Sequence, residues 1–405
     1  MNILLIHEIF VTPDQGGGTR HYEFAKYLVQ MGHKVTVIAS NVDYLSGRRK
    51  DKKDEVRDGI RIIYSPTLSS VHKGFLGRGL AFLSFSLSSF IEALKVHDFE
   101  IVIGTSPPLF QAVTAFAIAR IKRKKFVFEV RDLWVDFARE LGIIRNGFIF
   151  FLLKKVEYLL YRNSDLVIVN SPGFLSYVPQ SIPREKVILI PNGVSTSDFD
   201  GATEKNMELV YKLGLLDKFV VMYTGNLGVA NDLDTVLNSA ILLKDFRDIV
   251  FIFIGGGIRK DEIKKQIVSK NLENVIVLDP VPKKDISKFI SLADVCIASI
   301  KDTPLLQLVY PNKVFDYMAS GKPTILTING VMRDVIEKSN GGIYVPPGDS
   351  LKLKEAILYY YNNREFVILH GNNARNYVKK NFEREDIARK FEAILLRLLD
   401  KDGKV

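Results

Sequence analysis

Short apolar runs recur along the chain, and each is followed by a turn and then by a segment whose apolar residues have helical spacing. In the first half these runs are "ILLIH", "KVTVIAS", "IRIIY", "EIVIGT", "KFVFEV", "DLVIVN" and "VILIPNG". After "STSDFDGATEKN" the pattern restarts with "KFVVMYTG", "IVFIFIGGG", "NVIVLDP", "DVCIAS", "KPTILT" and "GGIYVPP". Apolar strands that alternate with helices are typical of parallel sheets covered on both faces. The pattern therefore predicts an α/β fold with two doubly wound, Rossmann-like parallel-sheet domains in tandem.

Turn formers and acids replace hydrophobic residues between Asn192 and Lys205, which separates the two series. We therefore expect a first domain over residues 1–195 and a second over 196–382. Residues 383–405 hold a last helical stretch with no strand after it, and we expect this helix to cross back to the first domain. Residues 46–58, "SGRRKDKKDEVRD", are highly charged and predict a mobile loop.

Glycine-rich turns follow three of the predicted strands, in "DQGGGTR", "TGNLG" and "IGGGIRK". Ligands of open parallel sheets bind beyond the carboxyl ends of the strands, so we expect these turns to converge on a cleft between the two domains. One glycine-rich turn is weak support, because glycine is useful at any tight strand-to-helix turn. None of the three matches GxGxxG or a P-loop, and a dinucleotide enzyme or an NTPase gains no support.

The stretch "LVYPNKVFDYMASGKPTI", residues 308–325, predicts a helix with Lys313 and Asp316 in its first turn. One interpretation is structural, since Pro311 is an ordinary helix opener and Gly321 an ordinary stop. The other is functional: the unpaired N–H groups of the helix start and the lysine form an anion site, and the carboxylate binds neighbouring hydroxyls. A ligand with a phosphate group next to two neighbouring hydroxyl groups is typically a nucleotide. The local sequence leaves both interpretations open.

The net charge of +10 is concentrated in the first half. Residues 1–195 contain 26 Lys and Arg against 18 Asp and Glu, while residues 196–405 contain 30 against 28. The basic residues lie beside two apolar stretches, residues 74–94 and 146–162, which favours an anionic membrane surface over nucleic acid. Arg78 and Glu92 interrupt the first stretch, so we expect it to lie at the interface rather than to span the bilayer. A pair of core-facing helices stays an alternative.

The beginning of the chain and its cysteine content bear on the compartment. "MNILLIHEIF" has no basic n-region, so it predicts a first strand rather than a signal peptide. The single cysteine, Cys296, lies in an apolar run and permits no intramolecular disulfide, which suits a reducing compartment. We expect a cytoplasmic protein bound peripherally to the inner face of the cell membrane.

The order of motifs along the chain resembles a known family. The glycine-rich loop, "EVRDLW", "PNGV", "YTGNLG", "FIGGG", "YPNKVFDYMASGKPTI" and "GGIYVPPGD" follow one another as in family 4 of the glycosyltransferases. The resemblance implies the GT-B fold and sugar transfer with retention at the anomeric carbon. Within the family the chain is similar to transferases that build O-antigen or capsule repeat units, including L-fucosamine transferases.

The resemblance also implies roles for individual residues. Asp316 stands where relatives place the acid that binds the nucleotide ribose, and Leu308 stands where many have a second acid, which puts one donor-sugar contact in doubt. Asn226 replaces a common arginine, so Lys313 becomes the candidate cation for the donor diphosphate. The remaining nucleotide-site candidates are residues near strand ends: Gly16, Gly17, Gly18, Gly225, Asn226, Gly255, Gly256 and Val281.

Arg131 stands where many relatives have a histidine, after the strand "KFVFEV". Its guanidinium suits the donor diphosphate or a phosphate of the acceptor, and Asp132 is expected to orient it. A buried structural pair of Arg131 and Asp132 is the alternative. "DFD" (198–200) and "DLD" (232–234) match a metal-binding pattern of another glycosyltransferase fold, but neither has a convincing context. We expect no metal and no other cofactor.

These observations predict a retaining glycosyltransferase. It is expected to move a sugar, an N-acetylated hexose, from a UDP-sugar donor to a lipid-linked, polyprenyl-diphosphate saccharide acceptor in cell-surface polysaccharide synthesis. A non-hydrolysing UDP-sugar epimerase shares the fold and stays an alternative. A non-catalytic nucleotide-sugar-binding protein is a third possibility, since Leu308 replaces an acid.

Overall fold

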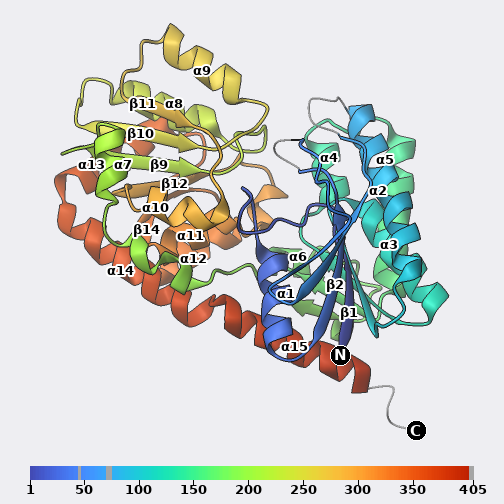
Figure 1. Ribbon diagram of the computed structural model, residues 1–405. Coiled ribbons are helices and arrows are strands. Elements are labelled where there is room, and N and C mark those ends of the chain that lie inside the picture. Colours follow the sequence, from blue (N-terminus) through green and yellow to red (C-terminus); the bar gives the residue numbers. More distant parts are fainter. Residues whose placement is uncertain (44–46, 70–74, 401–405) are drawn as a thin grey trace. The chain divides into compact units, whose positions relative to one another are not determined.

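The computed structural model describes residues 1–43, 47–69 and 75–400 of the chain. The chain forms two compact units, shown with their elements in Figure 1. Unit 1 comprises Met1–Val11, Thr19–Pro191 and Glu385–Val405, and unit 2 comprises Thr12–Gly18 and Asn192–Arg384. The division thus falls after Pro191, whereas the sequence placed it after residue 195. The loop Thr12–Gly18 belongs to unit 2, although it connects the first strand and first helix of unit 1.

Unit 1 is built on a sheet of eight strands in the order β3-β4-β2-β1-β5-β6-β7-β8. All neighbouring pairs are parallel except β3 and β4. In chain order the strands are β1 (Asn2–Ile6), β2 (Lys34–Ser40), β3 (Asp54–Arg57), β4 (Ile60–Ser65), β5 (Ile101–Ser106), β6 (Lys125–Val130), β7 (Leu166–Val169) and β8 (Val187–Leu189).

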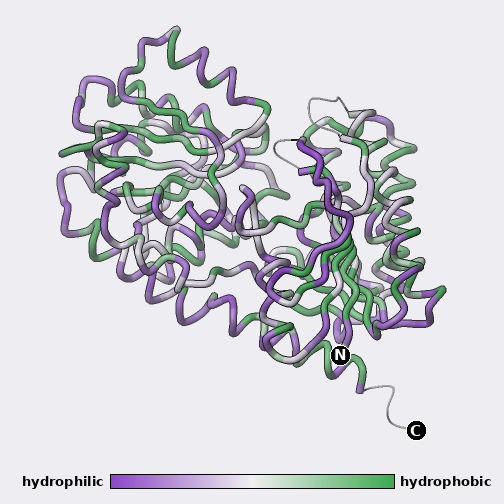
Figure 2. The backbone as a smooth tube through the Cα atoms, viewed as in Figure 1, coloured by the Kyte–Doolittle hydropathy of each residue, from purple (hydrophilic) through white to green (hydrophobic). Residues whose placement is uncertain are grey.

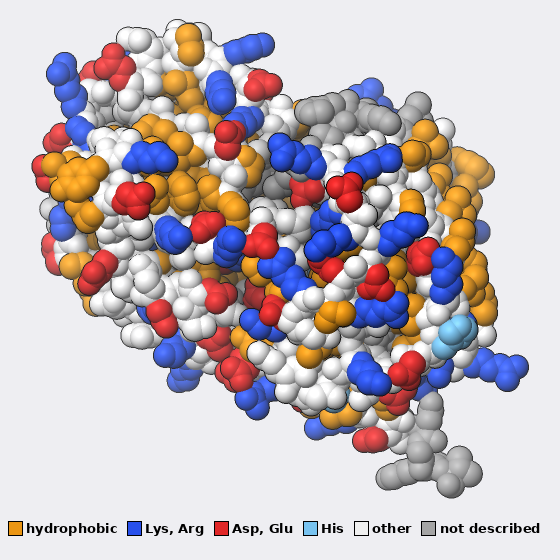
Figure 3. All heavy atoms as spheres, viewed as in Figure 1, with side chains coloured by type: hydrophobic (Ala, Val, Ile, Leu, Met, Phe, Trp, Pro, Cys, Tyr) orange, Lys and Arg blue, Asp and Glu red, His pale blue; other side chains and the backbone are white. Residues whose placement is uncertain are grey.

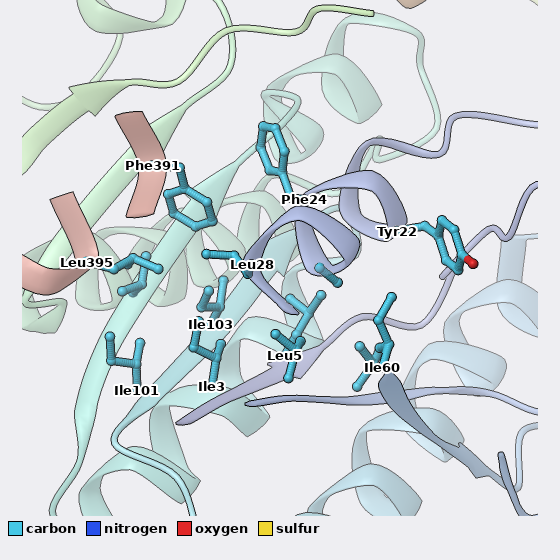
Figure 4. Close-up of a cluster of buried hydrophobic side chains, with 14 of the residues drawn as sticks. Ile3, Leu5, Tyr22, Phe24, Leu28, Ile60, Ile101, Ile103, Phe391 and Leu395 are labelled. Atoms are coloured by element: carbon cyan, nitrogen blue, oxygen red, sulfur yellow. The ribbon is translucent and has the colours of Figure 1, made fainter. Parts of the chain in front are cut away.

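Helices cover both faces of this sheet. They are α1 (Arg20–Gln30), α2 (Phe75–Lys95), α3 (Leu109–Lys122), α4 (Trp134–Glu140), α5 (Gly147–Asn163), α6 (Pro172–Leu175), the 3-10 turn η1 (Arg184–Lys186) and α15 (Arg384–Asp400). One core contains alternate strand residues such as Ile3 and Ile101, together with Phe24 of α1 and Phe391 of α15 (Figure 4). The C-terminal helix is therefore part of the core of unit 1.

The edge strand β3 corrects one sequence prediction. Residues 46–58 were predicted to form a mobile loop, but Asp54–Arg57 pair in antiparallel register with β4. Asp58 and Gly59 connect the two strands with φ angles of 47° and 76°. Two successive residues with positive φ are the signature of a tight hairpin turn, for which Asp-Gly is a favoured pair. The charged composition of this segment therefore concealed a β-hairpin.

Unit 2 is built on a six-stranded, all-parallel sheet in the order β11-β10-β9-β12-β13-β14. Its strands are β9 (Phe219–Thr224), β10 (Ile249–Ile254), β11 (Val275–Leu278), β12 (Val295–Ser299), β13 (Thr324–Thr327) and β14 (Gly342–Tyr344). Its helices are η2 (Thr196–Ala202), α7 (Met207–Lys212), α8 (Leu233–Leu242), α9 (Lys260–Ser269), η3 (Lys283–Asp285), α10 (Ile286–Ile290), η4 (Leu306–Leu308), α11 (Asn312–Ala319), α12 (Val331–Ser339), α13 (Ser350–Asn362) and α14 (Arg364–Asn381).

The central strands of both sheets are fully buried, which explains why apolar residues dominate them. Every residue of β5, β9 and β10 is buried, and Figure 2 shows the strands as hydrophobic segments within each unit. Cys296 lies in β12, where burial raises the pKa of its thiol. The predicted α/β fold with two doubly wound parallel sheets is confirmed.

Helices α2 and α5 of unit 1 expose large apolar side chains. On α2, Phe85 and Ala93 are buried, while Leu83 and Leu87 on another face are 46% and 70% exposed. On α5, Phe148 is 68% exposed. The exposed apolar side chains of the two helices are Leu80, Leu83, Leu87, Ile91, Phe148, Ile149, Phe151, Leu152, Tyr158 and Leu159. No helix in the described ranges has both the length and the apolar composition needed to cross a bilayer. Gly74, the start of the first apolar stretch, lies outside the described residues.

Candidate functional site

The start of α11 in unit 2 holds a lysine whose surroundings are unusual. Lys313 is the second residue of this helix, after Pro311 at the N-cap. Its Nζ donates to Tyr223 Oη at 2.7 Å, lies 3.9 Å from the centre of the Tyr223 ring and is 3.5 Å from Asn231 Oδ1. Tyr223 is in β9, so the lysine extends from the helix to the carboxyl end of the neighbouring central strand.

The ammonium group of Lys313 lies beside neutral groups, the Tyr223 hydroxyl and the Asn231 amide. Burial lowers the pKa of this lysine to about 7. Within the described part of the chain, no carboxylate forms an ion pair with Lys313. Removing a cation from water without a counter-ion costs free energy. The N–H groups of the first helical turn add positive potential, so this end of α11 is suited to receive an anion.

The glycine turns beside Lys313 are required by close packing within unit 2. A Cβ on Gly255 would lie 1.8 Å from the carbonyl oxygen of Gly225, because the turns after β9 and β10 are in direct contact. Gly225 has a φ of 122°, and a Cβ there would lie 3.2 Å from Lys313 Nζ. Gly225 therefore lies next to Lys313, and Gly255 lies next to Gly225. Gly256 lies next to Pro280, and Val281 is half-buried in the connection to η3.

Asp316, one turn further along α11, is paired with a lysine that the sequence analysis missed. Lys283 Nζ donates to both carboxylate oxygens of Asp316, each at 2.6 Å. Lys283 is 33 residues away in η3, so no local spacing links the two. The only signal was its place in "VPKKD", just after the candidate Val281.

The loop Thr12–Gly18 is hydrogen-bonded to the segment of unit 2 that contains Lys283. The backbone N–H of Lys283 donates to Gln15 O, and that of Lys284 to Pro13 O, each at 3.0 Å. Lys284 also forms a 2.7 Å ion pair with Asp14. Gly18 approaches the first residue of α11, since a Cβ there would lie 3.4 Å from Asn312 Nδ2. This loop, which contains the candidates Gly16, Gly17 and Gly18, therefore lies at the start of α11.

In unit 1, Arg131 and Asp132 follow the end of β6. Arg131 Nη2 donates to Pro107 O at 2.8 Å, and its Nε is buried without a hydrogen-bond partner. Burial raises the pKa of Asp132 to about 6, against the opposing attraction of Arg131. In the residues described, no hydrogen bond or ion pair joins the two side chains. The guanidinium donates to Pro107 instead, so the orienting role expected for Asp132 stays a prediction that no hydrogen bond among the described residues supports.

A buried polar cluster surrounds Arg131 at the ends of β1, β5 and β6. Glu129 accepts from Arg20 Nε at 3.1 Å and pairs with His21 Nε2 at 2.6 Å. Burial alone would raise the pKa of Glu129, but His21 and Arg20 together lower it. His7 packs 4.2 Å from the His21 ring and contacts Thr105 Oγ1 at 3.1 Å, so it is a hydrogen-bonded core histidine.

Glu8 belongs to the same cluster and was not found from the sequence. Its backbone N–H donates to Gln111 Oε1 at 2.6 Å, and Gln111 Nε2 donates to Pro107 O, which also accepts from Arg131. Its Oε2 is buried without a hydrogen-bond partner, and burial raises its pKa to about 8. The acid was visible in "HEIF", but its burial depends on the fold.

The two Asp-x-Asp patterns have structural roles. Asp232 caps the N-terminus of α8 and accepts from Thr235, while Asp234 pairs with Arg259. Asp200 pairs with Arg375. Among the described residues, no group of three or more His, Cys, Asp or Glu side chains has the arrangement of a metal site.

Comparison with known proteins identifies the family. Residues 15–198 match the model described as Glycosyltransferase Family 4, and residues 218–363 match Glycosyl transferases group 1. The chain belongs to the family 4 glycosyltransferases. It is therefore a transferase enzyme, and its two doubly wound domains form the GT-B architecture.

Named relatives and a solved structure agree with this assignment. WcaI of Escherichia coli K12, which carries the name of a colanic acid biosynthesis glycosyl transferase, is 23% identical over 96% of this chain and 98% of its own. The N-acetylgalactosamine-N,N'-diacetylbacillosaminyl-diphospho-undecaprenol 4-alpha-N-acetylgalactosaminyltransferase of Campylobacter jejuni is 29% identical over 33% of this chain and 35% of its own. The structure of Anabaena Alr3699/HepE in complex with UDP and glucose aligns with a TM-score of 0.75 at 18% identity, over 97% of this chain and 98% of that one.

Proposed function

We propose that this glycosyltransferase moves a sugar from a UDP-sugar to a lipid-linked saccharide in cell-surface polysaccharide synthesis. The observation that carries the proposal is Lys313, a half-buried cation at the start of α11 that forms no ion pair with any carboxylate of the described residues. A diphosphate supplies the missing negative charge. The complex of HepE with UDP and glucose supports this donor class, and the names of WcaI and the Campylobacter enzyme support the pathway.

In this proposal unit 2 holds the donor. As the bond between the anomeric carbon and the diphosphate breaks, negative charge grows on the β-phosphate beside Lys313 and the turn at Gly225. The acceptor oxygen forms the new bond on the same face of the sugar, and its proton passes to the departing diphosphate. An N-acetylated hexose is the proposed sugar, because the similar Campylobacter protein is named as an N-acetylgalactosaminyltransferase.

Asp316 is the proposed partner of the ribose hydroxyls. Since Lys283 occupies both of its oxygens, ribose must share the carboxylate with Lys283 or displace it. Asp316→Asn keeps the side-chain size, removes the charge and should weaken UDP binding, because hydrogen bonds to a charged acceptor are the stronger kind. Asp316→Glu restores the residue common in relatives and should retain binding. Calorimetric titration of UDP tests both, and an unchanged affinity in the Asn variant would remove Asp316 from the site.

Unit 1 is the proposed acceptor domain. Arg131 has a buried Nε without a partner, which suits a phosphate or sugar oxygen of the acceptor. The neighbouring carboxyl of Glu8 is also unpartnered at Oε2. Asp132 stays a candidate catalytic residue through its place beside Arg131, although the two are not hydrogen-bonded.

The exposed apolar faces of α2 and α5 support contact with a membrane. Figure 3 shows hydrophobic side chains gathered along one edge of unit 1, where Figure 1 places these helices. Large apolar patches on a protein surface mark interaction sites, and basic residues in the same half suit anionic lipid. We propose a cytoplasmic protein bound to the inner face of the cell membrane, where lipid-linked acceptors are found.

We expect catalysis without a metal, because the lysines and the helix N-terminus of unit 2 can stabilise the negative charge of the departing diphosphate.

One experiment separates this proposal from its rivals. The purified protein is incubated with a panel of UDP-sugars, with and without polyprenyl-diphosphate-linked N-acetylhexosamines, in EDTA and in added Mg²⁺. A transferase gives a larger glycolipid and UDP only when the acceptor is present. An epimerase changes the UDP-sugar without acceptor, and a binding protein changes nothing. Loss of transfer in EDTA would overturn the metal-independent mechanism.

A further inference from the structure

A small hydrogen-bond network connects Lys313 to the glycine turn after β9. Tyr223 Oη accepts from Lys313 Nζ and donates to the carbonyl oxygen of Asn226 at 3.0 Å. Asn231 Nδ2 donates to the same oxygen at 2.9 Å, while its Oδ1 faces Lys313 Nζ at 3.5 Å. Both side chains therefore contact the lysine on one side and the turn on the other.

This network contacts the ammonium group of Lys313 through neutral groups, so it does not neutralise the positive charge. Tyr223 is 1% exposed and burial raises its pKa, so its hydroxyl stays neutral. An amide and a neutral hydroxyl solvate an ammonium group, but they leave its positive charge available to a ligand. A carboxylate in either position would form an ion pair with Lys313 and compete with an incoming anion. The carbonyl of Asn226 accepts two hydrogen bonds, which fixes the turn relative to the lysine.

We propose that Tyr223 and Asn231 are positioning residues that hold Lys313 and the turn at Gly225 in the geometry that binds a diphosphate. Neither residue is required to touch the ligand. The inference rests on the proposed function, in which Lys313 meets the donor diphosphate, and it adds the two residues that prepare the lysine for this role.

The first test compares two tyrosine-to-phenylalanine variants. Tyr223→Phe removes the hydroxyl that contacts Lys313. Tyr317→Phe is the matched control, because this buried hydroxyl accepts from the N–H of Thr224 at 2.8 Å, one residue from Tyr223, and no hydrogen bond in the described part of the chain joins it to Lys313. Each variant is titrated calorimetrically with uridine, UDP and inorganic pyrophosphate, and its melting temperature is measured.

We expect Tyr223→Phe to weaken UDP and pyrophosphate binding about tenfold or more, the size of a lost hydrogen bond to a charged group, and to leave uridine affinity unchanged. We expect Tyr317→Phe to lower the melting temperature, but not to weaken UDP and pyrophosphate binding selectively relative to uridine binding. If Tyr223→Phe weakens all three ligands equally, or none of them, the positioning role is wrong, since a purely structural effect does not distinguish the diphosphate from the nucleoside.

The second test uses charge. Asn231→Asp is nearly isosteric and gives Lys313 the carboxylate that it lacks. We expect at least a tenfold loss of pyrophosphate affinity, whereas Asn274→Asp, at another buried asparagine of unit 2, should have no ligand-specific effect. An Asn231→Asp protein that binds pyrophosphate like wild type overturns the inference.

The outcomes also separate this inference from the proposed function. If wild type binds pyrophosphate in a Tyr223-dependent way but transfers no sugar to any acceptor, the positioning role stands and the transfer proposal fails. If UDP binds and transfer occurs but both variants behave like wild type, only the positioning role fails. A wild-type protein that binds neither UDP nor pyrophosphate overturns both.

Discussion

At the scale of single residues, Lys313 combines a cost in stability with a proposed gain in function. Its half-buried ammonium group has no carboxylate partner among the described residues, so Lys313→Met should raise the free energy of unfolding by roughly 1 kcal/mol. The same change should lower kcat/KM by about a hundredfold or more, by analogy with the loss of a donor that stabilises developing negative charge. Denaturant unfolding and steady-state kinetics on one preparation check both. A variant that is less stable, or that keeps its activity, contradicts this account.

The pKa of Lys313 also predicts how UDP binding depends on pH. In the free protein the pKa of Lys313 is about 7, and a bound diphosphate raises this pKa. At a pH between the pKa of the free protein and that of the complex, binding is therefore coupled to the uptake of a proton by Lys313. Affinity should be highest below pH 7 and should fall by up to about tenfold per unit as the pH rises above it. Titration from pH 7 to pH 9 keeps the UDP phosphates ionised throughout. Lys313→Arg stays protonated in this range, and an equal slope in that variant would assign the titration to another group.

The sequence predicted only part of the candidate site, for a physical reason. Lys313 and Asp316 could be found because their spacing at the start of a helix, with Asp316 one turn after Lys313, is a local property. Lys283 and Tyr223 could not, since they reach α11 only through tertiary packing, 33 and 90 residues away along the chain. Arg131 shows the converse, since its guanidinium donates to Pro107 O, 24 residues away, although Asp132 is its neighbour in sequence.

At the scale of elements, buried strands were the clearest signal. The central strands of both sheets could be located because a strand covered on both faces is predominantly apolar. The edge strand β3 was missed because its side chains are exposed or half-buried and mostly charged. The pair Asp58-Gly59 was the remaining hairpin signal, and it was outweighed by the charge pattern around it.

This hairpin gives a prediction about Gly59. Its φ is 76°, and a Cβ would lie 2.5 Å from Cγ1 of Val29 on α1. Gly59→Ala should therefore cost about 1 to 3 kcal/mol through backbone strain and displacement of Val29. Gly32→Ala is the control, because Gly32 has a φ of 89° but no atom within 4 Å of the position that a Cβ would take. Equal costs in denaturant unfolding would show that the contact with Val29 contributes nothing.

At the scale of the whole molecule, the sequence indicated apolar, basic segments but not which of their faces are exposed. The structure answers this for α2 and α5, where one set of apolar side chains packs inside unit 1 and another meets solvent. Lys154, a basic residue of α5, pairs with Asp136 at 2.8 Å and also with Glu157. It is therefore a poor probe of lipid binding, because its replacement would leave two carboxylates without their partner.

The membrane proposal is best tested on the exposed face of α2. Each basic residue near an anionic surface contributes roughly 1 kcal/mol to the free energy of membrane binding, and this contribution decays within a Debye length of about 8 Å at physiological salt. Apolar side chains inserted into the interface add a contribution that does not depend on salt. In liposome sedimentation, wild type should bind anionic vesicles more than neutral ones and retain some binding in high salt.

Leu83→Ser with Leu87→Ser should remove the salt-resistant binding and leave UDP affinity intact, because both residues lie in unit 1, whereas Lys313 lies in unit 2. Val268→Ser is the matched control, since Val268 is an exposed apolar residue on α9 of unit 2. If the control loses as much binding as the α2 variant, general hydrophobicity rather than this face attracts lipid. If wild type ignores both kinds of vesicle, the apolar faces of α2 and α5 serve another contact, and a water-soluble acceptor becomes the better proposal.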